Sequence, residues 1–217
     1  SLVAAEPEAE SEPAVPVEPD VVPAVEAVPE PVVASHSTSS GASVVFSPDP
    51  QSLPEYVAWD RTLGSPLDDV SDDELDDLLV EIVTFEGPMH AELAFRRVVK
   101  ACGGSKLGSR VKARLEESLK RVIRRSRVRF LKDGVRDPLK RTLYAPDRPS
   151  VLPRSAGDRS LEDVPWSELA TVSDMFDEDT DEETLLRAVL ALYGRKSLTG
   201  QAETLLTKAF ACTWTEE

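Results

Sequence analysis

The sequence predicts a mainly α-helical protein made of tandem winged-helix-like three-helix units, the first of which carries a β-ribbon wing. Apolar residues recur at helical spacing in successive segments after residue 70, and two short runs after residue 126 alternate with period two. The second half of the chain also repeats the first at a constant offset of 91 residues, which indicates a duplicated unit. A segment rich in Pro, Glu and Val precedes both units.

Residues 1–52 are predicted to be a disordered acidic linker. Prolines interrupt helix and strand every few residues, and the ionised side chains are all acidic, so they repel one another. Pro13 and Pro16 have the spacing of a PxxP docking peptide, but a linker is the preferred interpretation. Tyr56 and Trp59 follow this segment, and we expect them to attach it to the folded domain or to contact a partner.

The first unit is predicted to span residues 53–148. Ser71 and Glu74 form a capping box that begins a helix through about Phe85, and Gly87-Pro88 ends it. The pattern then predicts a second helix, a glycine-rich turn, a third helix and two strands, over residues 89–102, 103–108, 108–126, 127–131 and 139–145. Three helices followed by a ribbon are the order of a winged helix.

Residues 158–217 are predicted to be a second, acidic and incomplete helical repeat, joined to the first by a linker at 149–157. A shift of 91 residues aligns several pairs without a gap, namely Glu92/Glu183, Arg96/Arg187, Val98/Val189, Gly103/Gly194, Leu107/Leu198 and Leu115/Leu206. The earlier helix matches weakly at the same shift, with Leu75 on Trp166 and Leu78 on Leu169. Thr180 to Glu183 supplies another capping box. The basic face is lost, and the chain ends where a wing would begin.

Charge is segregated along the chain, although the net charge is −15. Residues 1–95 carry 1 basic and 21 acidic side chains, residues 96–148 carry 18 and 5, and residues 149–217 carry 6 and 14. Two cysteines and two histidines are too few and too scattered for a metal site, and no cofactor motif is present. No apolar run could span a bilayer and no signal peptide is recognisable, so we expect a cytoplasmic protein.

The candidate site is the basic third helix together with the ribbon that follows it. Val111, Leu115, Leu119, Val122 and Ile123 are expected on its buried side, and the arginines on an open side. A basic helix and a basic wing that face one duplex would hold nucleic-acid phosphates, with DNA preferred to RNA. The predicted contact residues are Lys106, Arg110, Arg114, Arg121, Arg124, Arg125, Arg127, Arg129, Lys132, Arg136, Lys140 and Arg141.

An alternative is that acidic segments of the same chain, at 68–81 or 174–183, pair with this basic helix. The module would then serve protein interaction or autoregulation.

No other stretch of the sequence is organised for catalysis. The loop GGSKLGS at 103–109 lacks the glycine before lysine and the Ser/Thr after it that a phosphate-binding loop requires. His90 has no nucleophile or second ligand nearby, and a polar residue at a helix start is the preferred interpretation. The acidic run at 174–183 lacks the glycine and the alternating spacing of a calcium-binding loop.

A resemblance over about residues 70–210 rests on three features: the EGPMH block at 86–90, the Gly-Ser-Arg turn at 108–110 and the helix pair after that turn. They are similar to a C-terminal module of unknown function in large bacterial superfamily 1 helicases, which often also carry a restriction-endonuclease-like (Vsr-like) domain. The resemblance implies that a nucleic-acid-handling ATPase lies upstream in a longer bacterial chain. Family members tend to be more basic just before the turn glycine, where this chain has Lys106-Leu107.

Together these observations predict a non-catalytic nucleic-acid-binding accessory module of a helicase- or nuclease-type protein. Upstream helicase or nuclease domains are its expected protein partners, and no membrane contact is expected.

Overall fold

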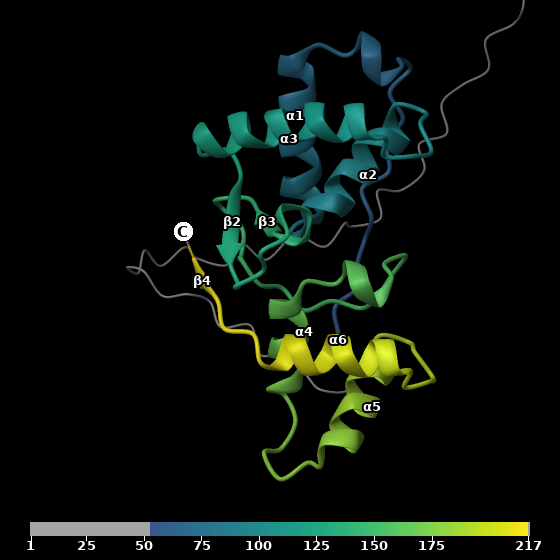
Figure 1. The fold of residues 1–217 in the computed structure, drawn as a ribbon, viewed down its shortest axis with the longest axis vertical. Helices are drawn as coiled ribbons and strands as arrows, with labels where there is room; N and C mark the ends of the chain where they lie inside the picture. Colours follow the sequence, from purple (N-terminus) through teal and green to yellow (C-terminus); the bar gives the residue numbers. More distant parts are fainter. Residues whose placement is uncertain (1–52, 217) are drawn as a thin grey trace, which may run out of the picture. The chain divides into compact units, whose positions relative to one another are not determined.

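The computed structural model describes residues 53–216, in which six α-helices and a small antiparallel sheet are formed (Figure 1). The prediction of a mainly α-helical fold is therefore confirmed. The predicted linker at 1–52, with its PxxP spacing, lies outside the described residues. None of the helices within 53–216 has the length and apolar character needed to cross a membrane.

Helix α1 (Asp72–Glu86) begins at the predicted capping box. The Ser71 hydroxyl accepts a hydrogen bond from the Glu74 amide, and the Glu74 carboxylate accepts one from the Ser71 amide. The helix ends before Gly87, as predicted. Its inner face is fully buried in the core of the first unit, through Leu75, Leu79, Ile82 and Val83.

The second helix, α2 (Ala91–Ala101), starts two residues later than predicted. Met89 and His90 form strand β1 instead, which pairs antiparallel with a strand of the ribbon. The apolar pattern alone could not distinguish a strand from a helix start here. Met89 is fully buried, and an apolar residue at this position is compatible with either element. Helix α2 contributes Phe95 and Val98 to the core.

Helix α3 (Ser109–Arg124) lies across α1, and the predicted ribbon follows it (Figure 1). The ribbon consists of β2 (Arg129–Lys132) and β3 (Thr142–Tyr144), with a 3₁₀ turn, η2 (Pro138–Lys140), where the second strand was expected to begin. Strand β3 lies between β1 and β2, so Leu143 pairs with both Met89 and Phe130. This sheet connects the ribbon to β1, which directly precedes α2.

The second half contains α4 (Trp166–Ser173), α5 (Glu182–Leu192) and α6 (Gly200–Phe210). Helices α5 and α6 start 91 residues after α2 and α3, as the sequence offset predicts. Gly103 and Gly194 both end their helices with a positive φ, of 74° and 69°.

The first helix of the second half departs from the predicted alignment. Helix α4 starts 94 residues after α1, so fully buried Leu169 takes the place of Leu75, and the predicted match of Leu75 with Trp166 is wrong. The reason is that α5 follows the start of α4 sooner than α2 follows the start of α1.

Two further details of the second half differ from expectation. The N-cap of α5 is Asp181, whose carboxylate accepts from the Thr184 amide at 3.0 Å, so the predicted capping box starting at Thr180 is wrong. The segment after α6 forms β4 (Thr215–Glu216), which pairs with the outer edge of β2 (Figure 1). It therefore extends the sheet of the first half.

The two halves are joined by buried charged groups. The fully buried Glu86 carboxylate accepts hydrogen bonds from the Tyr56 hydroxyl, the Trp59 amide and the Arg97 guanidinium, and Arg97 also bonds Asp158 at 2.8 Å. Tyr56 and Trp59 are both buried, so they attach the first described residues to the folded domain.

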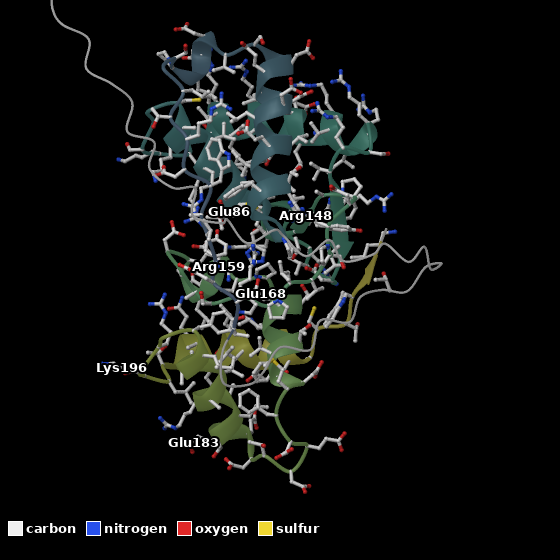
Figure 2. The ribbon with its side chains drawn as sticks, turned by 180° about the vertical axis from the view of Figure 1, so that it is seen from behind. Glu86, Arg148, Arg159, Glu168, Glu183 and Lys196 are labelled. Atoms are coloured by element: carbon white, nitrogen blue, oxygen red, sulfur yellow. The ribbon has the colours of Figure 1, made fainter. Side chains whose placement is uncertain are left out.

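A second buried pair lies on the other side of this junction. The Arg159 guanidinium bonds the Glu168 carboxylate at 2.8 Å, and both side chains are fully buried. Arg154, in the predicted linker at 149–157, donates to the carbonyls of Glu86 and Pro88 at 2.8 Å. Figure 2 shows Glu86, Arg159 and Glu168 close together between the helices of the two halves.

Candidate functional site

The basic helix α3 faces an acidic partner, the first turns of α1. Asp72, Asp73 and Asp76 gather near the N-terminus of α1, where carboxylates are favoured by the helix dipole. Because α3 packs across this part of α1, its arginines meet these carboxylates. The paired residues on and next to the two helices define the acidic–basic layer: Asp68, Asp72, Asp73, Asp76 and Asp77 with Arg110, Arg114, Arg121, Arg125 and Arg127.

Asp76 is the centre of this layer and is fully buried. Its carboxylate accepts hydrogen bonds from the Ser118 hydroxyl at 2.6 Å and from the Arg121 guanidinium at 2.8 Å, with Arg125 at 3.3 Å. Burial alone would raise the pKa of Asp76, but the bonds from Arg121 and Ser118 and the arginine charges hold this pKa below its usual value. Asp76 is therefore ionised and paired.

Arg114 is held by backbone as well as by charge. Its guanidinium donates to the Leu67 carbonyl at 2.7 Å, to the Val70 carbonyl, and to the Asp72 carboxylate at 3.1 Å. These bonds fasten the segment before α1 to α3. They use most of the donors that a phosphate would need.

The remaining pairs lie at the edge of the layer. Arg127 contacts Asp77 at 2.7 Å, whereas Arg110 and Arg125 approach Asp68 and Asp73 only to 3.8 Å. Exposed pairs of this kind contribute roughly 0–1 kcal/mol each. Their main effect is to cancel charge.

The expectation that the arginine side of α3 is open is wrong for Arg114 and Arg121, whose side chains are only 29% and 26% exposed. At about 100° per residue, Arg121 and Arg125 lie beside the buried stripe that contains Leu115 and Val122, and not opposite to it. Ser118 lies between the arginines and the apolar residues and is fully buried. The helical pattern did not predict its burial, because serine is polar and is not part of the apolar face.

The other predicted contact residues are dispersed. Lys140 pairs with Glu92 at 3.0 Å, and Arg141 stacks over the Phe130 ring at 5.1 Å. Lys132 is exposed but has a partner. Four predicted contacts are exposed and make no ion pair within residues 53–216, namely Lys106, Arg124, Arg129 and Arg136. The structure thus divides the predicted set into an internally paired group and an open group.

His90, predicted as a polar residue at a helix start, is the N-cap of α2 and is almost completely buried. Its Nδ1 atom has no hydrogen-bond partner in the described part of the chain. Burial lowers the pKa of His90 to about 4, so the ring is neutral near pH 7. Within residues 53–216, no group of three or more His, Cys, Asp or Glu side chains could hold a metal ion.

Residues 65–113 match the family described as a protein of unknown function, DUF3320. The chain thus carries a DUF3320 domain that spans α1, α2 and the start of α3. It includes all the carboxylates of the acidic–basic layer but, of its arginines, only Arg110. Comparison of the chain with curated proteins and with solved structures gives no match in either set.

Proposed function

We propose that residues 53–216 form a non-catalytic protein-interaction module. In this proposal a winged-helix-like unit, with helices α1 to α3 and the ribbon, is joined rigidly to a second three-helix repeat that lacks the basic face. The order of helices and strands supports a winged-helix-like first unit, and the shared 91-residue spacing of α2/α5 and α3/α6 supports the duplication. This was the alternative that the charge distribution of the sequence left open.

The observation that carries the proposal is the acidic–basic layer. A phosphate could reach Arg114 or Arg121 only by displacing a carboxylate that is already bonded to it. Breaking the Arg121 pair would leave the buried Asp76 carboxylate with only Ser118 and the more distant Arg125, and weakening the pairing of a buried charge is unfavourable, so the net gain from a phosphate contact is small. The basic stripe of α3, made of Arg110, Arg114, Arg121 and Arg125, is therefore poorly suited to bind a polyanion.

The outward face of α3 supports the same conclusion. It exposes Ala113 and Glu117, and Glu117 bonds Lys120 at 2.7 Å. In a winged helix this face would enter the major groove, where a carboxylate opposes phosphate and a short apolar residue reads little. A mixed-charge face of this kind attracts a polyanion less than a uniformly basic face would.

Nucleic-acid binding is a second candidate, supported by the open group of cations. The three arginines of this group, Arg124, Arg129 and Arg136, are exposed and, like Lys106, have no ion pair within residues 53–216. In this version they, and not the stripe on α3, would hold phosphates for a helicase- or nuclease-type protein of which the chain is an accessory. Membership of a helicase remains a prediction from the sequence resemblance.

Fluorescence anisotropy of labelled DNA and RNA duplexes and single strands, titrated with the full chain at several salt concentrations, separates these functions. For a protein-interaction module we expect no saturation below roughly 100 µM protein at physiological salt. For binding by the open group we expect a log–log salt slope of about −3, abolished in an R124A/R129A/R136A variant.

A third result would contradict both versions. A slope of about −4 to −5 that falls in an R114A variant would mean that the paired stripe itself holds phosphates. The matched control is Arg187→Ala on α5, which removes an exposed arginine from the half without a basic face.

A further inference from the structure

The two repeats differ at the place where the acidic–basic layer lies. Helix α6 packs on α4 as α3 packs on α1 (Figure 1), so positions 91 residues apart on α3 and α6, and 94 residues apart on α1 and α4, are equivalent. The polar side chains of the layer have apolar counterparts in the second repeat: Ala170 for Asp76, Ala209 for Ser118, Leu205 for Arg114 and Trp166 for Asp72. Ala170 and Ala209 are buried, like the residues that they replace.

The backbone before the two helices is the same in both repeats. A 3₁₀ turn precedes α1 and another precedes α4, namely η1 (Leu67–Asp69) and η3 (Leu161–Asp163), again 94 residues apart. In each turn the carbonyl of the first leucine accepts a hydrogen bond from the amide of the valine that follows the turn, at 3.3 Å in both. The two leucine carbonyls therefore have the same place in their repeats.

In the first repeat this place is filled by Arg114. Its guanidinium donates to the Leu67 carbonyl at 2.7 Å and to the Asp72 carboxylate at 3.1 Å. In the second repeat Leu205 stands at the equivalent position and has no donor. Within residues 53–216, no side chain donates a hydrogen bond to the Leu161 carbonyl. The second repeat thus has the acceptor without the guanidinium.

Two adjoining pockets lie beside Leu205. Each has a volume of about 370 Å³, and they share Glu162, Gln201 and Leu205. Leu161 lines the first pocket and Trp166 lines the second, and both side chains are only half-buried. At the shared wall the Gln201 amide donates to the Glu162 carboxylate. The pockets leave room for a side chain that enters from outside.

We propose that these pockets bind an arginine side chain of a partner protein, whose guanidinium takes the position that Arg114 has in the first repeat. The Leu161 carbonyl and the exposed Glu162 carboxylate are its acceptors. Trp166 replaces the carboxylate of Asp72 with an indole ring, on which a guanidinium can stack. Arginine is preferred to lysine, because its planar group donates in several directions at once and stacks on aromatic rings.

The charge of the second half favours a cationic partner. Residues 149–217 carry 14 acidic and 6 basic side chains. Of the cations that line the pockets, Arg195 bonds the Arg159 carbonyl at 3.2 Å and Lys140 pairs with Glu92 at 3.0 Å. Lys208 is exposed and makes no ion pair within residues 53–216, so it opposes a bound guanidinium. This inference rests on the proposed protein-interaction function and names the chemistry of the partner.

The test is an NMR titration of the full chain with three blocked pentapeptides of glycine that carry arginine, lysine or leucine at the centre. We expect the arginine peptide to shift the Trp166 indole and the Leu161 and Leu205 methyl resonances, with a Kd on the order of 1 mM. The lysine peptide should bind roughly fivefold more weakly. The resonances of Leu115 and Val122 in the first half should stay in place.

Four variants locate the bound side chain. Glu162→Gln should weaken the arginine peptide roughly fivefold, and Lys208→Met should strengthen it about twofold. Leu205→Arg supplies the guanidinium within the chain and should abolish binding. Thr207→Arg is the matched control, because it adds the same charge to an exposed position of α6 outside both pockets. It should change the affinity by less than about twofold.

Equal affinity for the arginine and lysine peptides, or no shift at Trp166 and Leu205 in the unsubstituted chain, would overturn the proposal. Stronger binding of the leucine peptide would assign an apolar occupant and would also overturn it. None of these readings depends on the folding of a variant. The anisotropy titrations above report on the proposed function separately, so a failure of either one is recognised by itself.

Discussion

His90 shows how a single buried residue contributes to the pH dependence of stability. Burial is the largest cause of its lowered pKa, and the charge of Lys140 acts in the same direction. The unfolded chain has the ordinary histidine pKa of about 6.5, whereas the folded chain has about 4. Between these values the unfolded state binds more protons, so stability falls as pH falls through this window.

We therefore expect the unfolding free energy to drop by roughly 3 kcal/mol between pH 6.5 and 4 on account of His90. A His90→Leu variant should lose this part of the pH dependence, whatever its stability at neutral pH. Urea denaturation at several pH values measures it. Parallel profiles for the two proteins would show that His90 is protonated in the folded state.

Asp76 and Ser118 show which contacts of single residues could be predicted from the sequence and which could not. The sequence shows two helices with complementary charges, Asp72 and Asp76 on one and Arg121 and Arg125 on the other, each pair four residues apart. That spacing was the signal for the acidic–basic layer. Choosing between this pairing and phosphate binding required the position of α3 across α1, which depends on packing and not on local pattern.

At the scale of elements, both repeats end their second helix with the same device. Gly103 and Gly194 have positive φ, and the following amides bond back to Val99 and Leu190 at 2.8 Å. This recurrence was predictable, because a glycine after an amphipathic helix is the usual C-terminal signal. The 94-residue offset between α1 and α4 could not be predicted, because the length of a loop does not change the periodicity of the helices around it.

Replacing either glycine by alanine tests this equivalence. A Cβ atom at Gly103 or Gly194 would meet nothing within 4 Å, so only the backbone conformation opposes it. We expect Gly103→Ala and Gly194→Ala each to lower the unfolding free energy by about 1 kcal/mol. Gly108→Ala is the control, since its φ is −71° and it too has open space. A neutral Gly194→Ala would show that the second repeat ends its helix differently in solution.

At the scale of the whole molecule, the buried charges make the two halves one structural unit. Glu86 belongs to α1, Arg97 to α2, and Asp158 to the segment before α4. The hydrogen bonds to Asp158 and Glu86 raise the pKa of Arg97 despite its burial, so it stays charged. No sequence pattern predicts this network, because Glu86 and Asp158 are far apart in the chain and neither belongs to a run of charged residues.

Removing Arg97 should therefore affect both halves. We expect Arg97→Met to cost roughly 3–5 kcal/mol, because it leaves Glu86 buried with its charge uncompensated. Arg61→Met, which removes an exposed pair with Glu81, should cost less than about 1 kcal/mol. Calorimetry should show one transition for the unsubstituted chain. Two separated transitions there would mean that the halves are independent.

The central claim is that the basic stripe of α3 is neutralised within the chain, and a double-mutant cycle between Asp76 and Arg121 tests it most directly. Urea denaturation of the D76A, R121A and D76A/R121A variants gives the coupling energy of the pair. The buried carboxylate and the guanidinium 2.8 Å away predict a favourable coupling of about 2 kcal/mol. A coupling below about 0.5 kcal/mol would contradict the account, because Arg121 would then be free to bind a polyanion.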